Sequence, residues 1–500
     1  MRQMNTVKVT INGIQFEAEP NTTILKVASA NGISIPTFCY HPNLSIAANC
    51  RMCLVEVEGA PKLLPACQTE IRDGMKIWTE SEKVKSWRKQ NLEFILLHHP
   101  IDCPICDAAG DCKLQNFYNE YDWEKSRLWS FTDKLHKSKR KILGPNVIYD
   151  AERCILCTLC IRFCKEIYGQ HLLDSRNRGN RREIIVAEGE TLDFPYSLML
   201  TEICPVGALT NRHFRFKKRC WFLSSSPGIC PGCATGCATI VDHDEGIIFR
   251  LRPRQDIEVN GPWLCDDGVL AGELHNTERI SSPAILVNGE QKPVSMEMAI
   301  QKAGEILKQT PSEKIGVVLS AGCTCEENSA LMNAREALNI TGPIFIEGRP
   351  EGEEDNILRN KDKNPNKRGA KLVAQGKETL ERKDLIELVN AGKIDVLLCL
   401  GSDGPDKDDF HRNASIISLS SRRGNLSNNA SVVFPAPSYA ETKGTYINFK
   451  GMERKFDISI KSWGSYKPPL QVWETLNILF EKTGITAKKF SGDNLWVSAR

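Results

Sequence analysis

The chain has 500 residues, which is too many for one hydrophobic core, so several domains are expected. Its formal net charge of +3 argues against binding to nucleic acid or to an anionic membrane, which would need a basic excess. No apolar run reaches the roughly 18 residues of a transmembrane segment. Residues 1–9 lack the apolar core of a signal peptide, so we expect a soluble chain of the cytosol.

The number and spacing of the cysteines indicate metal binding. Seventeen of the 20 cysteines precede residue 266, and several stand in C-x2-C pairs. Disulfides at this density belong to small secreted domains, whereas thiolates at such spacings in a reducing compartment bind metal. The choice at each group of cysteines is therefore between zinc and an iron–sulfur cluster.

The first group of cysteines follows a β-rich segment. Its members are Cys39, Cys50, Cys53 and Cys67. Residues 7–18 alternate in polarity around Asn12-Gly13, a type I′ hairpin signal, and Thr22 or Thr23 can cap a short helix over 24–30. A hairpin, a helix and a cysteine loop resemble a plant-type ferredoxin, although the first gap here is ten residues long. The resemblance implies a 2Fe–2S cluster, with a zinc site as the alternative.

The second group contains a histidine in the order H-x3-C-x2-C-x5-C. Its members are His99, Cys103, Cys106 and Cys112. One histidine among three cysteines is also typical of structural zinc, but this order resembles the His-ligated 4Fe–4S cluster of complex I, iron-only hydrogenases and related formate dehydrogenases. His98 is the alternative ligand, and His99 is preferred because it directly precedes the proline. A helix is expected before this group, from the capping-box spacing of Thr79 and Glu82 and an apolar stripe of Val84, Trp87 and Phe94.

The third group is a C-x2-C-x2-C triplet of Cys154, Cys157 and Cys160. Cys164 and Cys204 compete for the fourth position. Bacterial two-cluster ferredoxins carry proline after the fourth cysteine, but Lys165 follows Cys164 and no second triplet lies nearby. Cys204, which precedes a proline, is therefore the better partner for a 4Fe–4S cluster, and Cys164 is interpreted as a buried thiol.

The fourth group has the spacing C-x2-C-x3-C-x27-C. Its members are Cys230, Cys233, Cys237 and Cys265. A zinc ribbon would need a second C-x2-C pair in this group, but Cys265 stands alone. The spacing resembles the 4Fe–4S domain that opens molybdopterin oxidoreductases. Of the remaining cysteines, Cys399 is expected to be buried in a strand.

The C-terminal half has an ordinary α/β composition. Residues 315–319 and 396–400 are short apolar runs typical of buried parallel strands, and 326–338 has helical spacing. Residues 349–371 are charged and rich in Gly and Asn, so an exposed loop is expected. Residues 432–448 resemble an element of the molybdopterin oxidoreductase fold. No cysteine stands where such enzymes ligate molybdenum, so no molybdopterin is expected, although ligation by Ser281 or Ser282 stays open.

Hydride chemistry is expected on a partner. The sequence contains no G-x-G-x-x-G after a strand, no G-x4-G-K-[ST] and no G-x-S-x-G. We therefore expect no catalytic residue in this chain and no cofactor site beyond the clusters. A chain that holds only clusters moves single electrons, so another subunit must split the electron pair of NADH.

The order of the four groups resembles the large iron–sulfur subunit of bacterial NADH:quinone oxidoreductase, respiratory complex I. The resemblance implies a multidomain α+β and α/β chain with one 2Fe–2S and three 4Fe–4S clusters. It implies electron transfer from a flavin- and NADH-binding subunit towards quinone-facing iron–sulfur subunits, within an oxidoreductase (a translocase). It places the chain on the cytoplasmic face of the bacterial inner membrane, attached only through partners, with no nucleic-acid binding.

Five domains are predicted from these patterns. Residues 1–82 form a β-grasp ferredoxin-like 2Fe–2S domain, 83–125 a helical segment with the His-ligated 4Fe–4S cluster, and 145–218 a half-degenerate two-cluster ferredoxin module. Residues 219–275 form a 4Fe–4S domain of the molybdopterin oxidoreductase type, and 276–500 its shortened α/β domain. The C-terminal part is short even for this family.

Three rival functions stay open from the sequence. The chain could be the catalytic subunit of an NAD-linked formate dehydrogenase, which would bind molybdenum or tungsten. It could serve a soluble hydrogenase as an iron–sulfur subunit. As a binding protein without redox activity, it would instead contain zinc and little iron.

Overall fold

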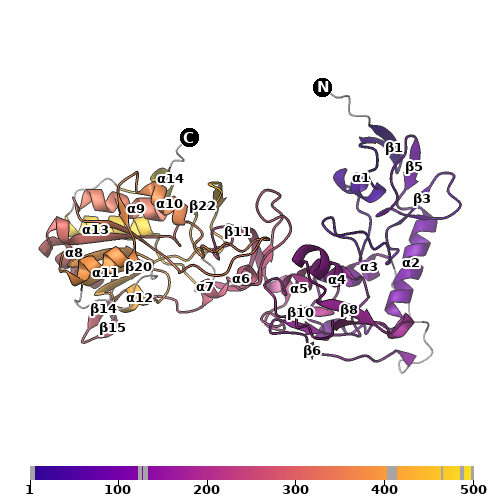
Figure 1. Cartoon of the computed structure of the whole chain (residues 1–500), viewed down its shortest axis with the longest axis horizontal. Helices are drawn as coiled ribbons and strands as arrows, with labels where there is room; N and C mark the ends of the chain where they lie inside the picture. Colours follow the sequence, from indigo (N-terminus) through magenta and orange to yellow (C-terminus); the bar gives the residue numbers. More distant parts are fainter. Residues whose placement is uncertain are drawn as a thin grey trace. The chain divides into compact units, whose positions relative to one another are not determined.

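The computed structural model describes residues 6–121, 127, 133–401, 414–462, 466–484 and 489–496. The chain divides into two compact units, Met1–Phe222 and Leu223–Arg500 (Figure 1). All four cysteine groups lie in described segments, three in the first unit and one in the second.

A five-stranded sheet with the order β2-β1-β5-β3-β4 opens the first unit. Its strands are β1 (Val7–Ile11), β2 (Ile14–Ala18), β3 (Leu54–Val57), β4 (Leu64–Pro65) and β5 (Met75–Trp78). The predicted hairpin is confirmed: Ile11 pairs with Ile14, and Asn12 and Gly13 take φ angles of 50° and 85°. The predicted helix is confirmed as α1 (Ile24–Ala30), which Thr23 caps by accepting a hydrogen bond from the Lys26 N–H at 3.4 Å. The helix buries Ile24 and Ala28 against the sheet.

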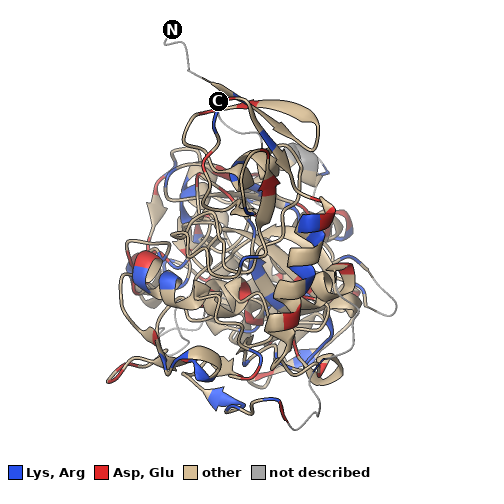
Figure 2. Cartoon of the chain, turned by 90° about the vertical axis from the view of Figure 1, so that its right-hand side faces the viewer, with Lys and Arg blue, Asp and Glu red and all other residues tan. Residues whose placement is uncertain are grey.

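The helix α2 (Glu82–Leu96) precedes the second group, as expected, but two details of the prediction are wrong. Ser81 is the N-cap, because the Thr79 hydroxyl is already held by the Asn12 side chain at 2.8 Å. Trp87 and Phe94 are 43% and 73% exposed, so only Val84 of the expected apolar stripe is buried. The buried residues of α2 are Val84, Arg88 and Leu92, spaced four apart on one face. Acidic and basic side chains are interspersed along this helix (Figure 2).

The rest of the first unit consists of short elements around cysteine loops. Its helices are α3 (Lys113–Tyr121), α4 (Leu159–Phe163), a π-helical turn over Cys164–Tyr168, and α5 (Met199–Ile203). One small antiparallel sheet contains β6 (Lys141–Ile142), β7 (Val147–Tyr149) and β10 (Leu209–Asn211), and another contains β8 (Leu173–Arg176) and β9 (Glu183–Val186). The pairing of β10 with β7 brings the residues after Cys204 back beside those before Cys154.

The second unit begins with an antiparallel sheet that carries the fourth cysteine group. Its strands are β11 (Ser224–Ile229), β12 (Ala238–Asp244) and β13 (Ile247–Pro253). Cys230, Cys233 and Cys237 occupy the loop between β11 and β12. Cys265 is the N-cap of α6 (Asp266–Val269), which α7 (Glu273–Asn276) follows.

An eight-stranded sheet forms the remainder of the second unit, in the order β15-β14-β21-β20-β19-β16-β17-β18. Its strands are β14 (Ala284–Val287), β15 (Glu290–Pro293), β16 (Ile315–Ser320), β17 (Ile344–Glu347), β18 (Thr379–Leu380), β19 (Val396–Leu400), β20 (Ser415–Ser420) and β21 (Val432–Pro435). The two predicted strands are confirmed as β16 and β19, which pair in parallel, and Cys399 is buried within β19.

Helices cover both faces of this sheet (Figure 1). One face packs against α8 (Met296–Gln309), α9 (Cys325–Ala337), α10 (Lys367–Val373) and α13 (Val472–Thr483). The other packs against α11 (Arg382–Asn390) and α12 (Asn425–Asn428). The predicted helix over 326–338 is thus confirmed as α9, shifted by one residue. Outside the sheet lie β22 (Gly444–Ile447), β23 (Glu453–Phe456) and α14 (Gly492–Leu495).

The expectation of an exposed loop over 349–371 is wrong in part. The segment includes the start of α10, and Asn364 and Asn366 are buried. The reason is that the loop packs on the fourth cysteine group: the Ala234 N–H donates to the Asp362 carbonyl at 2.9 Å, and the Thr235 hydroxyl donates to the Leu358 carbonyl at 2.7 Å. Over the whole described part of the chain, we find no helix long and apolar enough to cross a membrane.

Candidate iron–sulfur centres

The first three cysteines of the first group lie between α1 and β3, and Cys67 is the second residue after β4. Cys39, Cys53 and Cys67 are buried, and Cys50 accepts a hydrogen bond from the Phe38 N–H at 3.5 Å. The thiols lie in hydrogen-bonded pairs, Cys39 with Cys50 and Cys53 with Cys67. The hydrogen bond with Cys50 lowers the pKa of the Cys39 thiol and raises that of the Cys50 thiol, so the two thiols of this close pair share one proton more readily than they lose both.

The two histidines before the second group differ in their surroundings. Burial lowers the pKa of His99 to about 4, so the ring is neutral, as a metal ligand must be. Its Nδ1 is buried and, within the described residues, has no hydrogen-bond partner. The Nδ1 of His98 instead accepts a hydrogen bond from the Leu135 N–H at 3.3 Å. An orphaned buried ring nitrogen beside three cysteines fits metal ligation by His99 better than by His98.

The three cysteines of the second group stand at the ends of helical turns, and Cys106 follows the turn that Cys103 begins. Cys103 begins a 3-10 turn, and Cys112 directly precedes α3. Burial raises the pKa of the Cys112 thiol, while the N–H groups of Gln115 and Leu114 favour its thiolate. Burial likewise raises the pKa of Cys106, and the Arg153 guanidinium acts in the opposite direction. Each of these two thiolates therefore has a nearby donor or positive charge that offsets part of its desolvation.

The third group surrounds a small, mainly apolar cavity. Among the described residues that line it are Cys154, Cys157, Cys160 and Cys204, and Cys164 is not one of them. The structure thus brings together the triplet and the cysteine 44 positions beyond it. Cys164 is fully buried in the π-helical turn instead, where burial raises the pKa of its thiol to about 12.

The backbone around this cavity directs N–H groups at the sulfurs of Cys154, Cys157 and Cys204. Leu156 and Thr158 take left-handed φ angles of 55° and 62°, which turns the loop around the triplet. Burial raises the pKa of each triplet thiol and that of Cys204. N–H groups two residues further on favour the thiolates of Cys154, Cys157 and Cys204. Donors directed at sulfur are the kind of interaction that tunes a metal–thiolate site.

The fourth group is enclosed by three separate segments of the second unit. All four cysteines are buried, and the Gly232 N–H donates to the Cys230 sulfur at 3.4 Å. The Arg349 guanidinium donates to the Pro231 carbonyl at 2.5 Å, and the Phe449 N–H donates to the Ala234 carbonyl at 2.9 Å. Burial raises the pKa of Cys230 to about 12. Residues after β17 and after β22, far apart in sequence, therefore pack on the loop that carries this group.

Close contacts join the first three groups to one another. The Lys113 N–H, next to Cys112, donates to the carbonyl of Pro205, next to Cys204, at 3.0 Å. The guanidinium of Arg162 donates to the carbonyls of Cys39 at 2.7 Å and Cys157 at 3.2 Å. The third group thus adjoins both of the others.

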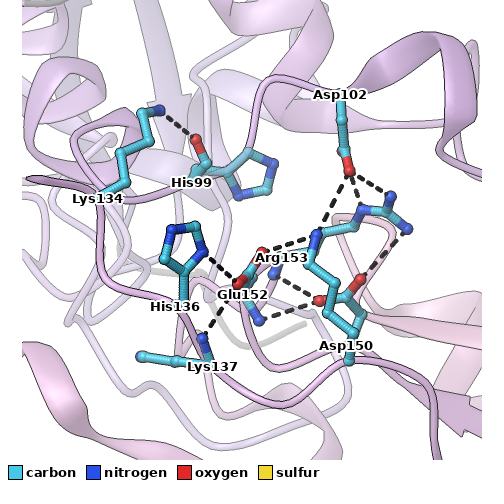
Figure 3. A network of polar contacts seen from close by, with 9 residues as sticks. His99, Asp102, Lys134, His136, Lys137, Asp150, Glu152 and Arg153 are labelled. Atoms are coloured by element: carbon cyan, nitrogen blue, oxygen red, sulfur yellow. Dashed lines mark hydrogen bonds and ion pairs between the residues drawn. The ribbon is translucent and has the colours of Figure 1, made fainter. Parts of the chain in front are cut away.

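A polar network lies between the second and third groups (Figure 3). Arg153 donates from Nε and one terminal nitrogen to the two carboxylate oxygens of Asp102, at 3.2 and 2.7 Å. Glu152 accepts from the Lys137 N–H at 3.1 Å, and Lys134 donates to the His99 carbonyl at 2.7 Å. Sequence reasoning missed Arg153 and Arg162; the available signal was an arginine beside or close to a predicted cysteine ligand.

The cysteines outside the four groups have ordinary surroundings. The Cys220 thiol lies 3.4 Å from the Ala109 carbonyl, and Cys325 is buried beside Asn366. Considering the described residues alone, no set of three or more His, Cys, Asp or Glu side chains is arranged to hold a single metal ion.

Three family models match the first unit. Residues 4–82 match a 2Fe-2S iron-sulfur cluster binding domain. Residues 88–127 match the NADH-ubiquinone oxidoreductase-G iron-sulfur binding region, and residues 144–210 match the ferredoxin-like domain of NADH-quinone oxidoreductase subunit 3. The chain is therefore a multidomain α/β protein with a 2Fe–2S domain and 4Fe–4S binding regions.

Curated relatives carry related names. The NADH-ubiquinone oxidoreductase 75 kDa subunit of Reclinomonas americana is 36% identical over 371 residues, which are 71% of this chain and 52% of the relative. The NADH-quinone oxidoreductase G subunit of Rickettsia bellii is 36% identical over 313 residues, 62% of this chain and 45% of the relative. The NADH-quinone oxidoreductase G subunit of Streptomyces coelicolor is 34% identical over 355 residues, which are 70% of this chain and 42% of the relative. The chain thus spans about half the length of these relatives.

One solved structure is similar over a smaller part. A crystal structure of an NAD+-reducing [NiFe]-hydrogenase in the H2-reduced state is 27% identical, covering 43% of this chain and 91% of the hydrogenase chain. The TM-score is 0.39, which is too low to show a common fold.

Proposed function

Because the chain belongs to the family of the NADH-quinone oxidoreductase G subunit and the 75 kDa subunit, we propose that it is the electron-transfer subunit of such an enzyme. It receives electrons from a flavin- and NADH-binding partner and delivers them towards quinone-facing iron–sulfur subunits. Its attachment to the membrane is through those partners, and it contains no catalytic residue of its own. The curated relatives extend well beyond the matched half, so the activity of the whole enzyme is part of the proposal.

One 2Fe–2S and three 4Fe–4S clusters are proposed. The 2Fe–2S ligands are Cys39, Cys50, Cys53 and Cys67. The 4Fe–4S ligands form three sets: His99, Cys103, Cys106 and Cys112; Cys154, Cys157, Cys160 and Cys204; and Cys230, Cys233, Cys237 and Cys265. The observation that carries the proposal is the cavity lined by the four cysteines of the third group, two of which are 44 residues apart in sequence.

When bound, iron–sulfur clusters supply one-electron transfer. The chain's own residues bury the ligands, exclude water and direct N–H groups at sulfur. A neutral His99 in place of a thiolate removes one negative charge from the second set. Such differences in ligand charge, burial and hydrogen bonding let one chain set several reduction potentials.

The finer domain assignment is also proposed. The five domains are residues 1–82, 83–125, 145–218, 219–275 and 276–500, the last two of the molybdopterin oxidoreductase type without a pterin cofactor. The mostly parallel sheet with helices on both faces is compatible with the last of these.

Metal analysis combined with low-temperature EPR after reduction tests the proposal. We expect about 14 irons per chain, a 2Fe–2S signal, several 4Fe–4S signals and no molybdenum. Cys53→Ala should remove the 2Fe–2S signal alone, whereas the matched control Cys399→Ala, a buried cysteine of β19, should keep every signal. Stoichiometric zinc without iron would refute the proposal. Co-purification with a flavoprotein tests the partner assignment.

A further inference from the structure

Arg153 is a buried cation between two cysteine groups. The residue is only 4% exposed, although it directly precedes Cys154 in a short loop. Its guanidinium forms a two-pronged contact with Asp102, which directly precedes Cys103, and its remaining nitrogen lies 3.5 Å from the Asp150 carboxylate (Figure 3). One side chain thus bridges the loop of the second group and the loop of the third.

The methylene part of Arg153 also lies where the two groups meet. A Cβ atom built on Gly207 would be 2.4 Å from the Cys106 sulfur and 3.7 Å from the Arg153 Cδ. Gly207 is the third residue after Cys204. The arginine therefore packs against a segment of the third group and lies close to a thiol of the second.

The charged side chains around Arg153 differ in how much of each is exposed to solvent. Asp150 and Arg153 are buried, with side chains 4% and 5% exposed, and Asp102 is 22% exposed. Another cation of the network, Lys139, lies 3.7 Å from Asp102 and is 42% exposed. Water and salt screen Lys139 much more than they screen Arg153. Arg153 is thus the less screened of the two positive charges beside Asp102, and its guanidinium is permanently charged.

We propose that Arg153 is a positioning residue that fixes the loops of the second and third groups and raises the reduction potentials of the clusters bound by both. The proposal rests on the proposed function, since it concerns clusters held by those cysteines. Reduction adds one negative charge to a cluster, and a fixed positive charge nearby in a low-dielectric site favours the reduced form. Removal of the guanidinium would leave the carboxylates of Asp102 and Asp150 between the two cysteine groups without their cation, and this uncompensated negative charge would favour the oxidised forms of clusters bound there.

An EPR-monitored redox titration of the full chain with its clusters bound tests this inference. In Arg153→Gln we expect the 4Fe–4S signals of the second and third groups to titrate at lower potential. The equilibrium constant for reduction of each cluster should fall about tenfold, which is a shift of ~59 mV for one electron. Arg153→Lys keeps the charge and should return both signals most of the way to the native values. Arg335→Gln is the matched control, because this arginine donates to a backbone carbonyl, that of Gly342, in the other unit.

A second variant keeps the test decisive if Arg153→Gln fails to retain iron. Asp102→Asn removes negative charge and leaves the cation, so it should shift the same two signals to higher potential. Unchanged potentials in an iron-replete Arg153→Gln chain, or a shift of one signal alone, would overturn the shared role. Unchanged or lowered potentials in Asp102→Asn would do the same. An iron-free native chain would instead refute the proposed function itself.

Discussion

Gly207 offers a direct test of how closely the second and third groups are packed. In Gly207→Ala the new methyl group would lie 2.4 Å from the Cys106 sulfur and 3.2 Å from the Ala108 Cβ. Ordinary contact begins at 3.4 Å, so the sulfur or the glycine segment must move by about 1 Å. Cys106 is buried and cannot swing into solvent. The substitution should therefore displace Cys106, a proposed ligand of the second group, although Gly207 follows the last proposed ligand of the third.

Overpacking of this kind costs about 1–3 kcal/mol. For a unit the size of Met1–Phe222, each kcal/mol corresponds to about 2–4 °C in Tm, so the expected loss is about 2–12 °C. Calorimetry measures the Tm, and iron analysis with EPR should show loss or distortion of the His-ligated 4Fe–4S signal. Gly322→Ala is the control, because its nearest neighbour, the Ser320 hydroxyl, would be 3.6 Å away. A Gly207→Ala chain with full iron content, native signals and native Tm would refute the packing argument.

Three further predictions follow from the described geometry. Cys204→Ala should abolish the third 4Fe–4S signal, whereas Cys164→Ala should keep it; the reverse EPR result would exchange their roles. Burial raises the pKa of Glu327 to about 7 from 4.5, so the folded chain holds a proton that the unfolded chain releases, and stability falls as pH rises through that interval. Glu327→Gln should therefore gain about 3 kcal/mol relative to the native chain between pH 4.5 and pH 8, measured by thermal melts, and no gain would contradict the assignment. Iron removal should raise hydrogen exchange in residues 154–164 more than in α9, and equal protection before and after removal would show that the cavity holds its shape without metal.

Local sequence signals account for much of the fold. The β1–β2 hairpin follows from alternation and Asn12-Gly13, and the strands β16 and β19 follow from short apolar runs, because each signal depends on neighbours in the chain. Spacing also groups the cysteines within a loop, since a C-x2-C pair forms over a few residues.

Distant contacts explain what the sequence did not show. Arg88 replaces Trp87 and Phe94 on the buried face of α2 because it pairs with Glu80 at 2.5 Å and contacts Tyr121, 33 residues away. Thr79 does not cap that helix because Asn12, 67 residues away, already bonds its hydroxyl. Neither Tyr121 nor Asn12 can be identified as a partner of this helix from a local pattern.

In the candidate site, too, local spacing was predictable and distant contacts were not. The spacing of Cys154, Cys157 and Cys160 predicts a shared site, but the fourth position depended on the absence of a second triplet. The structure adds the cavity that Cys204 helps to line. The placement of Arg153 against Asp102, 51 residues away, has no local sequence signal.

The contact between the residues after Cys204 and the second group has a consequence for biogenesis. The four proposed ligands of the first group are all present once residue 67 has been made, well before the rest of the chain is synthesised. The second group obtains its neighbours Pro205 and Gly207 only with the segment that also supplies the last thiol of the third. A chain that ends before residue 204 would thus lack the fourth proposed ligand of the third group, and the second group, although its own four residues are present, would lack the segment that packs on Cys106. Final folding around the second group is therefore coupled to completion of the third.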